Sequence, residues 1–377
     1  MKILINGITL ENANLVPLLY RIKKWQSKGL EIHLVGNVTL NRRIRKLNIL
    51  KKNYKFINIR NTKIIRSKFD LIIEGLRRNL FLLKQIRKFK DFDFVYSISS
   101  MLDLIIFPFF LKIKYKKIQW VTVFDNIVPF SDPGNKFIRL LAWFYFQLSL
   151  ILLKKADKIF TVTKDLERYL SQKNFQKQKI IVLPNGIQTD LIRKAKKSLK
   201  YNIDALFVGR INETKGIYDM LNVLNIVKQQ FPKFKLAIVG TGDKYTEIKF
   251  NNKIRKMKLQ NNIDFLGYKN GIEKFNIIKS SKCFWFLSVS KSESFGVALL
   301  EAVCCGLPAI AYNLPVYREI YKNNEVLFFK QKDYQAIAEK VIQIIKSKLF
   351  VNKKRVLLLN KYSLSKIADK EYCFFQK

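Results

Sequence analysis

The stretch Ser290–Ala311 reads Ser-Lys-Ser-Glu-Ser-Phe-Gly-Val-Ala-Leu-Leu-Glu-Ala-Val-Cys-Cys-Gly-Leu-Pro-Ala-Ile-Ala. Its polar start runs into helix formers from Phe295 to Cys305, and Gly306 and a nearby proline end the helix before a short apolar strand. Ser294 is the expected N-cap, because a serine hydroxyl can accept a hydrogen bond from the first helical turn. The helix is therefore expected to begin where the polar residues cluster.

The start of this helix is a candidate anion site. The amides of Phe295, Gly296 and Val297 are expected to be free, with the positive end of the helix dipole behind them, which suits a phosphate group. Glu293 precedes the helix, and Glu301 lies two turns beyond the predicted cap on the same side. Two carboxylates at an anion site suit a ligand with hydroxyl groups on either side of a diphosphate.

The composition is strongly basic, with 71 lysines and arginines against 28 acidic residues and a formal net charge of +43. Such a charge suits an anionic partner, whether nucleic acid, an anionic membrane surface or a phosphorylated substrate. The alternative is that the basic residues, which are spread along the whole chain, are mostly solvated. With 377 residues, the chain is long enough for two domains that each bury a core.

The cysteines indicate neither a metal site nor disulfides. Four are present, none spaced as Cys-x-x-Cys, and His33 is the only histidine. His33 falls inside a predicted strand and is expected to be structural. This set of residues does not match the ligand spacing of a structural zinc site, and it suits a reducing compartment. The first residues lead directly into a strand without a signal-peptide pattern, so a cytoplasmic location is expected.

Strand and helix patterns alternate through the first half, which predicts parallel βαβ units. The expected strands are Lys2–Asn6, Leu30–Gly36, Tyr54–Ile59, Phe92–Ile98, Ile118–Phe124, Asp157–Thr163 and Ile180–Leu183. Helices are expected at 14–28 and 71–90, and 37–70 is expected to be irregular apart from its strand. On the second helix, Arg77 and Arg78 are expected on the outer face.

The most apolar segment lies between lysines at 136–155. Its 17 residues from 137 to 153 are interrupted by Arg139 and Gln147, whereas a spanning helix needs about 20 predominantly apolar residues. We therefore expect a buried helix, part of which faces a membrane surface.

A second βα series follows the turn Pro184-Asn185-Gly186 and a polar, lysine-rich connection. The strands expected there are 205–208, 236–239, 263–266, 283–287 and 326–329. This rhythm predicts two Rossmann-like domains, 1–184 and 185–360. The aromatic tail at about 361–377 is expected to pack back on the first domain.

Glycines and cations gather where strands of the second half end. Gly209 follows the strand 205–208, and Arg210 and Lys215 lie five residues apart on the same loop. Arginine suits two phosphate oxygens and lysine a point charge. Gly240 ends the next strand in a Gly-Thr-Gly turn. Each signal alone is weak, because lysine-rich chains form such pairs by chance and the Gly-Thr-Gly turn lacks the third glycine of a dinucleotide-binding motif.

Polar residues also follow the strand 118–124. They are Asp125, Asn126 and the loop Ser131–Gly134, at the strand end where ligands of open parallel sheets bind. The loop is a candidate site for a second substrate, or only a turn, since Asp-Pro-Gly is good turn chemistry. Asp91 and Asp93 stand at the opposite end of a strand and are interpreted as solvated, with metal binding a minor alternative.

The second half resembles the GT4 family of retaining glycosyltransferases, which has the GT-B fold. The motifs that carry the resemblance follow one another as Val-Gly-Arg at 208–210, Lys-Gly at 215–216, Val-Gly-Thr-Gly at 239–242, Phe-Leu-Gly-Tyr at 265–268 and the stretch 290–311. Glu293 and Glu301 match that family's pair of glutamates eight apart, and Leu183–Ile187 is similar to its interdomain signature. The resemblance is strong over about 157–312 and is one of pattern before that.

The resemblance implies an α/β fold with two Rossmann-like domains facing each other across a cleft. The first would hold the acceptor, and the second a UDP- or GDP-linked sugar as donor. Arg210 and Lys215 would bind the donor diphosphate and stabilise the departing charge, so that neither a metal nor another cofactor is needed. Glu293 would bind the donor sugar, and Glu301 the ribose hydroxyls.

The remaining donor-binding residues implied by the resemblance are small, polar or backbone contacts. The residues that would contact the nucleotide base are Gly267, Tyr268 and Lys269. Those expected at the phosphates and at the strand ends are Gly209, Gly240, Ser294, Phe295, Gly296 and Val297.

Two departures from the family concern the first domain. Where the family often places a histidine after the strand 118–124, this chain has Phe124-Asp125, so that role is empty or passes to Asp125 or Asn126. The first βα loop contains Gly7 but lacks the family's usual glycine pair. Gly7, Asp125 and Asn126 are the expected acceptor-side residues, and Asp125 joins Arg210, Lys215 and Glu293 in the expected catalytic set.

The leading hypothesis is a retaining glycosyltransferase that acts on a glycan or lipid-linked acceptor in polysaccharide or glycolipid synthesis. The charge and the segment 136–155 favour a peripheral position on an anionic membrane surface, at the inner face of the cell membrane. The missing histidine leaves open a catalytically silent sugar-nucleotide or glycan-binding protein on the same fold. Nucleic acid is not expected as a partner, since only the charge supports it.

Overall fold

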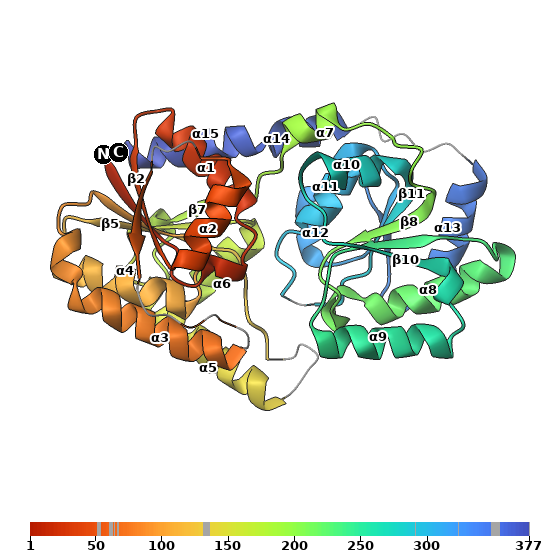
Figure 1. Ribbon diagram of the computed structural model, residues 1–377, viewed down its shortest axis with the longest axis horizontal. Helices are drawn as coiled ribbons and strands as arrows, with labels where there is room; N and C mark the ends of the chain where they lie inside the picture. Colours follow the sequence, from red (N-terminus) through yellow and green to blue (C-terminus); the bar gives the residue numbers. More distant parts are fainter. Residues whose placement is uncertain are drawn as a thin grey trace. The chain divides into compact units, whose positions relative to one another are not determined.

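The computed structural model describes residues 1–50, 54–59, 63, 65, 68–130, 136–290, 292–322, 324–347 and 355–376. The chain divides into two compact units. The first extends to Gly186 and takes in the C-terminal segment that begins at Leu364, and the second is built from Ile187–Ser363. Each unit contains one parallel sheet with helices packed against it (Figure 1).

The first sheet has the strand order β3-β2-β1-β4-β5-β6-β7. The strands are β1 Lys2–Asn6, β2 Glu31–Gly36, β3 Tyr54–Asn58, β4 Phe94–Ser97, β5 Gln119–Phe124, β6 Lys158–Thr161 and β7 Ile180–Val182. The α-helices of this unit are α1 Val16–Gln26, α2 Val38–Leu47, α3 Lys68–Lys84, α4 Leu102–Lys114, α5 Lys136–Leu153, α6 Lys164–Gln172 and α15 Leu364–Phe375. The apolar residues of β1 are wholly buried, as expected for a central strand covered on both faces.

The second sheet has the order β10-β9-β8-β11-β12-β13. Its strands are β8 Ile203–Val208, β9 Leu236–Val239, β10 Ile263–Gly267, β11 Ser281–Phe286, β12 Ala309–Tyr312 and β13 Leu327–Phe329. The α-helices are α7 Thr189–Lys194, α8 Ile217–Gln230, α9 Lys244–Lys256, α10 Gly271–Ser280, α11 Val297–Cys305, α12 Pro315–Ile320, α13 Tyr334–Ser347 and α14 Arg355–Lys361. Strand order reverses between β8 and β11, and ligands of such sheets bind outside the carboxyl ends of the strands at this point.

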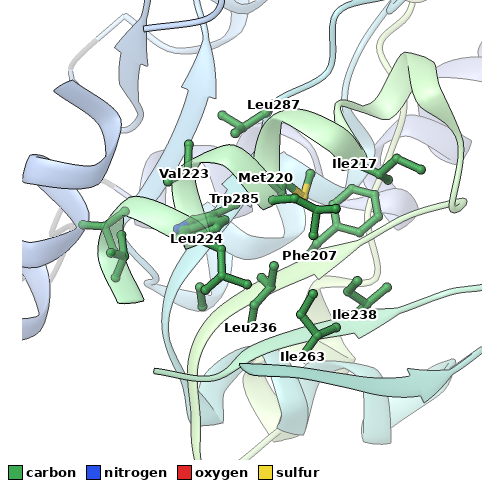
Figure 2. Close-up of a cluster of buried hydrophobic side chains, with 14 of the residues drawn as sticks. Phe207, Ile217, Met220, Val223, Leu224, Leu236, Ile238, Ile263, Trp285 and Leu287 are labelled. Carbon is green, nitrogen blue, oxygen red and sulfur yellow. The ribbon is translucent and has the colours of Figure 1, made fainter. Parts of the chain in front are cut away.

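The core of the second unit fixes these two strands against each other. Phe207 of β8, Leu236 of β9 and Trp285 of β11 are wholly buried, and Met220 and Leu224 of α8 pack among them (Figure 2). Side chains from neighbouring strands and one covering helix therefore interlock beneath the carboxyl edge. The loops that leave β8 and β11 start from a rigid base.

The expectation that 37–70 is irregular outside its strand was wrong for α2. Asn37 caps this helix, its side chain accepting a hydrogen bond of 2.8 Å from the Leu40 amide. Leu40 and Ile44 are the buried residues of α2. Two apolar positions among basic residues give a weak periodic pattern, which is why the helix was missed. Helices α4 and α6 were not anticipated either.

The expectation that Arg78 lies on the outer face of its helix was also wrong. Its side chain is completely buried. The guanidinium is 2.9 Å from Glu11 and 3.7 Å from Glu74, and it donates a hydrogen bond of 2.5 Å to the Ile8 carbonyl. An arginine can be buried when carboxylates and carbonyls surround it, and sequence spacing does not reveal those partners. Arg77, in contrast, is exposed.

The C-terminal helix α15 packs against α1 within the first unit. Arg21 of α1 is 2.6 Å from the buried carboxylate of Glu371, which also accepts a hydrogen bond of 3.1 Å from the Tyr96 hydroxyl. The Trp25 indole donates to the Ala368 carbonyl at 3.2 Å. A charged pair and an indole thus tie the end of the chain to the start of the first sheet.

Candidate functional site

The helix that follows β11 begins later than expected. Gly296, with φ of 70°, is the N-cap of α11, and the helix starts at Val297. A Cβ on Gly296 would lie 2.9 Å from a ring carbon of Tyr317, so both the backbone conformation and the space favour glycine. The prediction of Ser294 as the cap was therefore wrong. The left-handed residue ends the loop, and Ser294 remains within it.

This shift changes which amides are available at the helix start. The first-turn amides of a helix lack intrahelical partners, and here that turn begins at Val297. Phe295 is buried, with its ring edge-on to Tyr362 at 5.6 Å between centroids. Phe295 therefore anchors the loop in the core. Of the three residues whose amides were predicted to bind an anion, Val297 lies in the first turn of the helix.

Lys215 and Glu293 meet at the point where strand order reverses. Lys215 follows β8, Glu293 follows β11, and the Lys215 Nζ lies 2.5 Å from Glu293 Oε2. The Ser288 hydroxyl donates to the same oxygen at 3.0 Å. The ammonium also lies 5.7 Å from the centre of the Phe286 ring. The two residues were predicted as separate ligand contacts, and the structure brings them together as a pair.

A glycine makes this approach possible. Gly216 has φ of 73° and caps α8, and a Cβ there would lie 1.8 Å from the Leu287 carbonyl oxygen. Only a residue without a side chain lets the loop after β8 contact the end of β11 this closely. The Val289 amide donates to the Thr214 carbonyl at 3.0 Å and joins the same two segments.

Arg210 also follows β8 and lies on the same edge of the sheet, but its surroundings differ from those of Lys215. Its side chain is exposed, and within the part of the chain that the structure describes no residue pairs with its guanidinium. The neighbouring loops are fixed by backbone bonds: Gly209 donates to Val239 at 3.0 Å, and Gly240 to Gly267 at 2.9 Å. Arg210 is thus an available cation on an ordered edge.

Glu301 is buried on α11 and has a cation as its partner. Its Oε1 lies 2.6 Å from the Nζ of Lys274 on α10. The Lys274 ammonium also lies 4.6 Å from the Phe275 ring centre. Sequence reasoning missed Lys274. The available signal was the carboxylate on an apolar helix, which requires a partner, but nothing in the spacing identified which lysine supplies it.

The cysteines that follow Glu301 are core residues. Cys304 and Cys305 are both buried. Burial raises the pKa of the Cys305 thiol to about 12. Both thiols are therefore small neutral side chains at neutral pH.

The segment predicted to contact a base lies at the end of β10. Gly267 ends the strand, and the Tyr268 ring behind it is 62% exposed. The Lys269 ammonium is 2.8 Å from Glu273. An exposed aromatic ring on the ligand edge of a sheet can stack against a planar group, and the contact of this segment with a base stays a prediction.

The predicted acceptor-side residues lie at the carboxyl edge of the first sheet. Gly7 follows β1, and its amide donates to Val35 at 2.9 Å. Asp125 follows β5, accepts a hydrogen bond of 3.0 Å from the Ser99 hydroxyl, and has its pKa raised by burial. Asn126 is exposed. The candidate loop Ser131–Gly134 lies outside the described residues.

A buried carboxylate that was not predicted lies at the strand-order reversal of the first sheet. Asp103 of α4 accepts hydrogen bonds from the Thr9 hydroxyl and, at 2.9 Å, from the Tyr145 hydroxyl of α5. Burial raises the pKa of this carboxyl. An aspartate in the first turn of an apolar helix looks like an ordinary dipole partner in the sequence, so its buried setting could not be read there.

The remaining polar candidates do not gather into a metal site. Among the described residues, no group of three histidine, cysteine, aspartate or glutamate side chains could hold a metal ion. Asp91 is exposed, and Asp93 accepts a hydrogen bond of 2.7 Å from the Lys2 amide at the strand edge. His33 lies in β2, 2.9 Å from Glu31 and edge-on to Phe92.

Two family models match the chain. The model of glycosyl transferases group 1 matches residues 188–360, and that of glycosyltransferase family 4 matches residues 20–191. Because the two matches together take in most of both units, the chain belongs to the GT4 family of glycosyltransferases. The family predicted from the motifs is confirmed, and the two Rossmann-like units are those of the GT-B fold.

Relatives of the chain carry the same description. An uncharacterized glycosyltransferase of Methanocaldococcus jannaschii, MJ1069, is 26% identical over 68% of this chain and 69% of its own length. The O-antigen biosynthesis glycosyltransferase WclY of Escherichia coli is 25% identical over 74% of this chain and 78% of its own. In two further uncharacterized glycosyltransferases, from Haemophilus influenzae and M. jannaschii, the match spans 65% and 59% of the relative's length.

The fold has solved counterparts. The Anabaena protein Alr3699/HepE, solved in complex with UDP and glucose, superimposes with a TM-score of 0.76 and 12% identity. The match covers 100% of this chain and 99% of that one. At this identity the likeness establishes the fold alone.

Proposed function

We propose that this glycosyltransferase moves a sugar, with retention of configuration, from a UDP- or GDP-linked donor to a glycan or lipid-linked acceptor. The observation that carries the proposal is the Lys215–Glu293 pair of 2.5 Å at the strand-order reversal, with the exposed Arg210 on the same edge. A diphosphate there meets one available guanidinium and one ammonium that a carboxylate holds in position.

The roles follow from charge and position. Arg210 and Lys215 bind the diphosphate and stabilise the negative charge that develops as it departs, which requires no metal. Glu293, held by Lys215 and Ser288, accepts hydrogen bonds from sugar hydroxyls. Glu301 does the same for the ribose, oriented by Lys274.

The other donor contacts are made by backbone and an aromatic ring. The free amides at the start of α11, from Val297 on, face the distal phosphate. Tyr268 packs against the base.

The acceptor is proposed to bind the first unit, and the donor the second. Asp125 is the candidate base, because its raised pKa gives a carboxylate that can take up a proton nearer neutral pH. Phe124, at the position where a histidine was expected from the family, is wholly buried and stacks near Tyr169. The missing histidine is therefore not replaced by Phe124, and the role falls to Asp125 or Asn126.

Two comparisons support the substrate classes. The UDP and glucose of the Anabaena structure are consistent with a nucleotide-sugar donor, and the O-antigen pathway of WclY with cell-surface polysaccharide synthesis. We place the protein at the inner face of the cell membrane as a peripheral protein, since glycan precursors on lipid carriers would meet it there.

The test is release of nucleoside diphosphate from a panel of UDP- and GDP-sugars, with and without lipid extract as acceptor. We expect release from at least one donor, and a loss of about 10²-fold or more in Arg210→Ala. Full turnover by folded Arg210→Ala and Glu301→Ala variants would contradict the assignment. No release by the wild type, with tight donor binding, would instead favour the catalytically silent binding protein.

A further inference from the structure

Helix α5 carries a stripe of exposed apolar side chains. Along the helix the spacing is four, three, four and three residues, which places the side chains on one side. They are between 40% and 68% exposed and comprise Phe137, Leu141, Phe144, Leu148 and Ile151. At 1.5 Å per residue the stripe is about 21 Å long.

The stripe is not the side by which α5 joins the fold. Phe146, Ser149, Leu150 and Leu153 are the buried residues of this helix. On the packed side, the Tyr145 hydroxyl is bonded to Asp103 of α4 at 2.9 Å. One side of α5 thus packs into the core, and this packing does not explain the apolar stripe that the helix exposes.

Two adjoining helices expose apolar side chains as well. Helix α4 packs against both α3 and α5, and the three helices lie together along one side of the first unit (Figure 1). The exposed large apolar residues on α3 and α4 are Ile73, Leu76, Leu80, Phe110 and Ile113. We call the exposed apolar residues of α3, α4 and α5 the three-helix face.

The charges on these helices favour an anionic partner. Lys136, Lys154 and Lys155 bracket α5, and Arg77, Lys84 and Lys114 lie on or at the ends of the other two helices, all exposed. The acidic residues of α3, α4 and α5 that the structure describes are Asp70, Glu74 and Asp103, and the last two are buried. A second copy of a chain with net charge +43 would be repelled from such a face.

The topology of the first unit argues against α5 as a membrane-spanning helix. Among the described helices, α5 is the one long and apolar enough to span a bilayer. However, it connects β5 to β6, and Thr122 of β5 pairs directly with Ile159 of β6 in one sheet. A spanning helix would leave these paired strands on opposite sides of a hydrocarbon core about 30 Å thick.

We propose that the three-helix face binds the surface of an anionic lipid bilayer, with the apolar side chains in the interfacial region and the bordering cations at the lipid headgroups. This inference deepens the peripheral location proposed above by naming the surface responsible. It does not depend on the catalytic assignment, because none of its residues belongs to the donor site.

The experiment is co-sedimentation of the full chain with vesicles of phosphatidylcholine alone or mixed with phosphatidylglycerol, at low and high salt. We expect strong binding to the mixed vesicles, weakened by salt, and little binding to phosphatidylcholine. The variant Phe137→Ser/Phe144→Ser/Ile151→Ser should bind at least about 30-fold more weakly, because three large apolar side chains no longer enter the interface.

The matched control is Leu199→Ser/Tyr245→Ser/Ile248→Ser, which replaces three exposed large residues of the second unit. It should bind like the wild type. If the α5 variant does not fold, Leu76→Ser/Leu80→Ser on α3 is the substitute and should weaken binding at least about 5-fold.

Three outcomes would overturn the inference. They are equal binding by the α5 variant and the wild type, equal loss in the control, and a wild-type dimer in sedimentation equilibrium that the α5 variant abolishes. The last would assign the face to self-association. Nucleoside diphosphate release in vesicle-free buffer is measured in parallel and should be unchanged in the α5 variant, so failure of the catalytic proposal leaves the vesicle result interpretable.

Discussion

Replacing Lys274 by methionine tests how Glu301 is held. The Lys274 ammonium lies 2.6 Å from the Glu301 carboxylate, and their side chains are only 17% and 9% exposed. Methionine keeps most of the aliphatic stem and removes the charge. The variant therefore leaves a nearly buried carboxylate without its cation.

The expected loss of folding stability is large for the substitution of a single lysine. Removing one partner of a fully buried ion pair costs about 3–5 kcal/mol. Because Lys274 keeps some contact with water, we expect a decrease of about 2–3 kcal/mol in the free energy of unfolding. Glu301 also loses its orientation, and the loss of a charged hydrogen bond of about 1.5–3 kcal/mol to the ribose predicts a donor KM raised about 10- to 100-fold.

The assays are urea unfolding and donor kinetics on Lys274→Met, Glu301→Gln and the double variant. Glu301→Gln in the Lys274→Met background should restore most of the stability, since the unpaired charge is gone, but not the KM. The control is Lys282→Met. The side chain of Lys282 is 53% exposed and its ammonium lies 2.7 Å from Asp204, so the substitution should cost less than about 1 kcal/mol. The reasoning is refuted if Lys274→Met is as stable and active as the control, or if the double variant is no more stable than Lys274→Met.

Three further predictions concern Gly216, Arg21 and Asp125. Gly216→Ala should cost about 1–3 kcal/mol or more, since its φ of 73° and the Leu287 carbonyl exclude a Cβ, and it should lower kcat by displacing Lys215; an unchanged kcat with normal stability would contradict this. Arg21→Met should cost about 3–5 kcal/mol by leaving Glu371 buried and unpaired, measured by thermal unfolding, with Lys282→Met again as the control. If the Asp125 carboxylate is the base, its pKa, raised by burial, means that it ionises at higher pH than an ordinary aspartate, so the acid limb of the pH profile of kcat should be shifted in the same direction and disappear in Asp125→Asn; an identical limb in that variant would rule out the role.

The order of the strands could be predicted because fully buried parallel strands are short apolar runs that polar turns separate. Lys2–Asn6 and Ile203–Val208 are both of this kind. Helix α2 could not, because it buries only Leu40 and Ile44 among basic residues. A helix that buries few apolar residues has only a weak periodic pattern in a single sequence.

The candidate site was predictable in its residue types and less so in its pairing. Lys215 and Glu293 were both identified, each from its own loop, but their contact depends on Gly216, whose role requires knowing how close Leu287 comes. The start of α11 was misplaced because a left-handed glycine can end a loop where a serine cap was expected. Long-range partners of buried charges, such as Lys274 for Glu301, follow from packing and not from spacing.

The central claim is that the edge formed by Arg210, Lys215 and Glu293 binds the diphosphate of a nucleotide-sugar donor. Its most direct test is calorimetric titration of UDP and of GDP into the wild type and into Arg210→Ala/Lys215→Met. Two charge-assisted contacts, each of about 1.5–3 kcal/mol, predict that the variant binds the preferred nucleotide at least about 100-fold more weakly. Equal affinity in the folded variant, or no binding of either nucleotide to the wild type, would contradict the account.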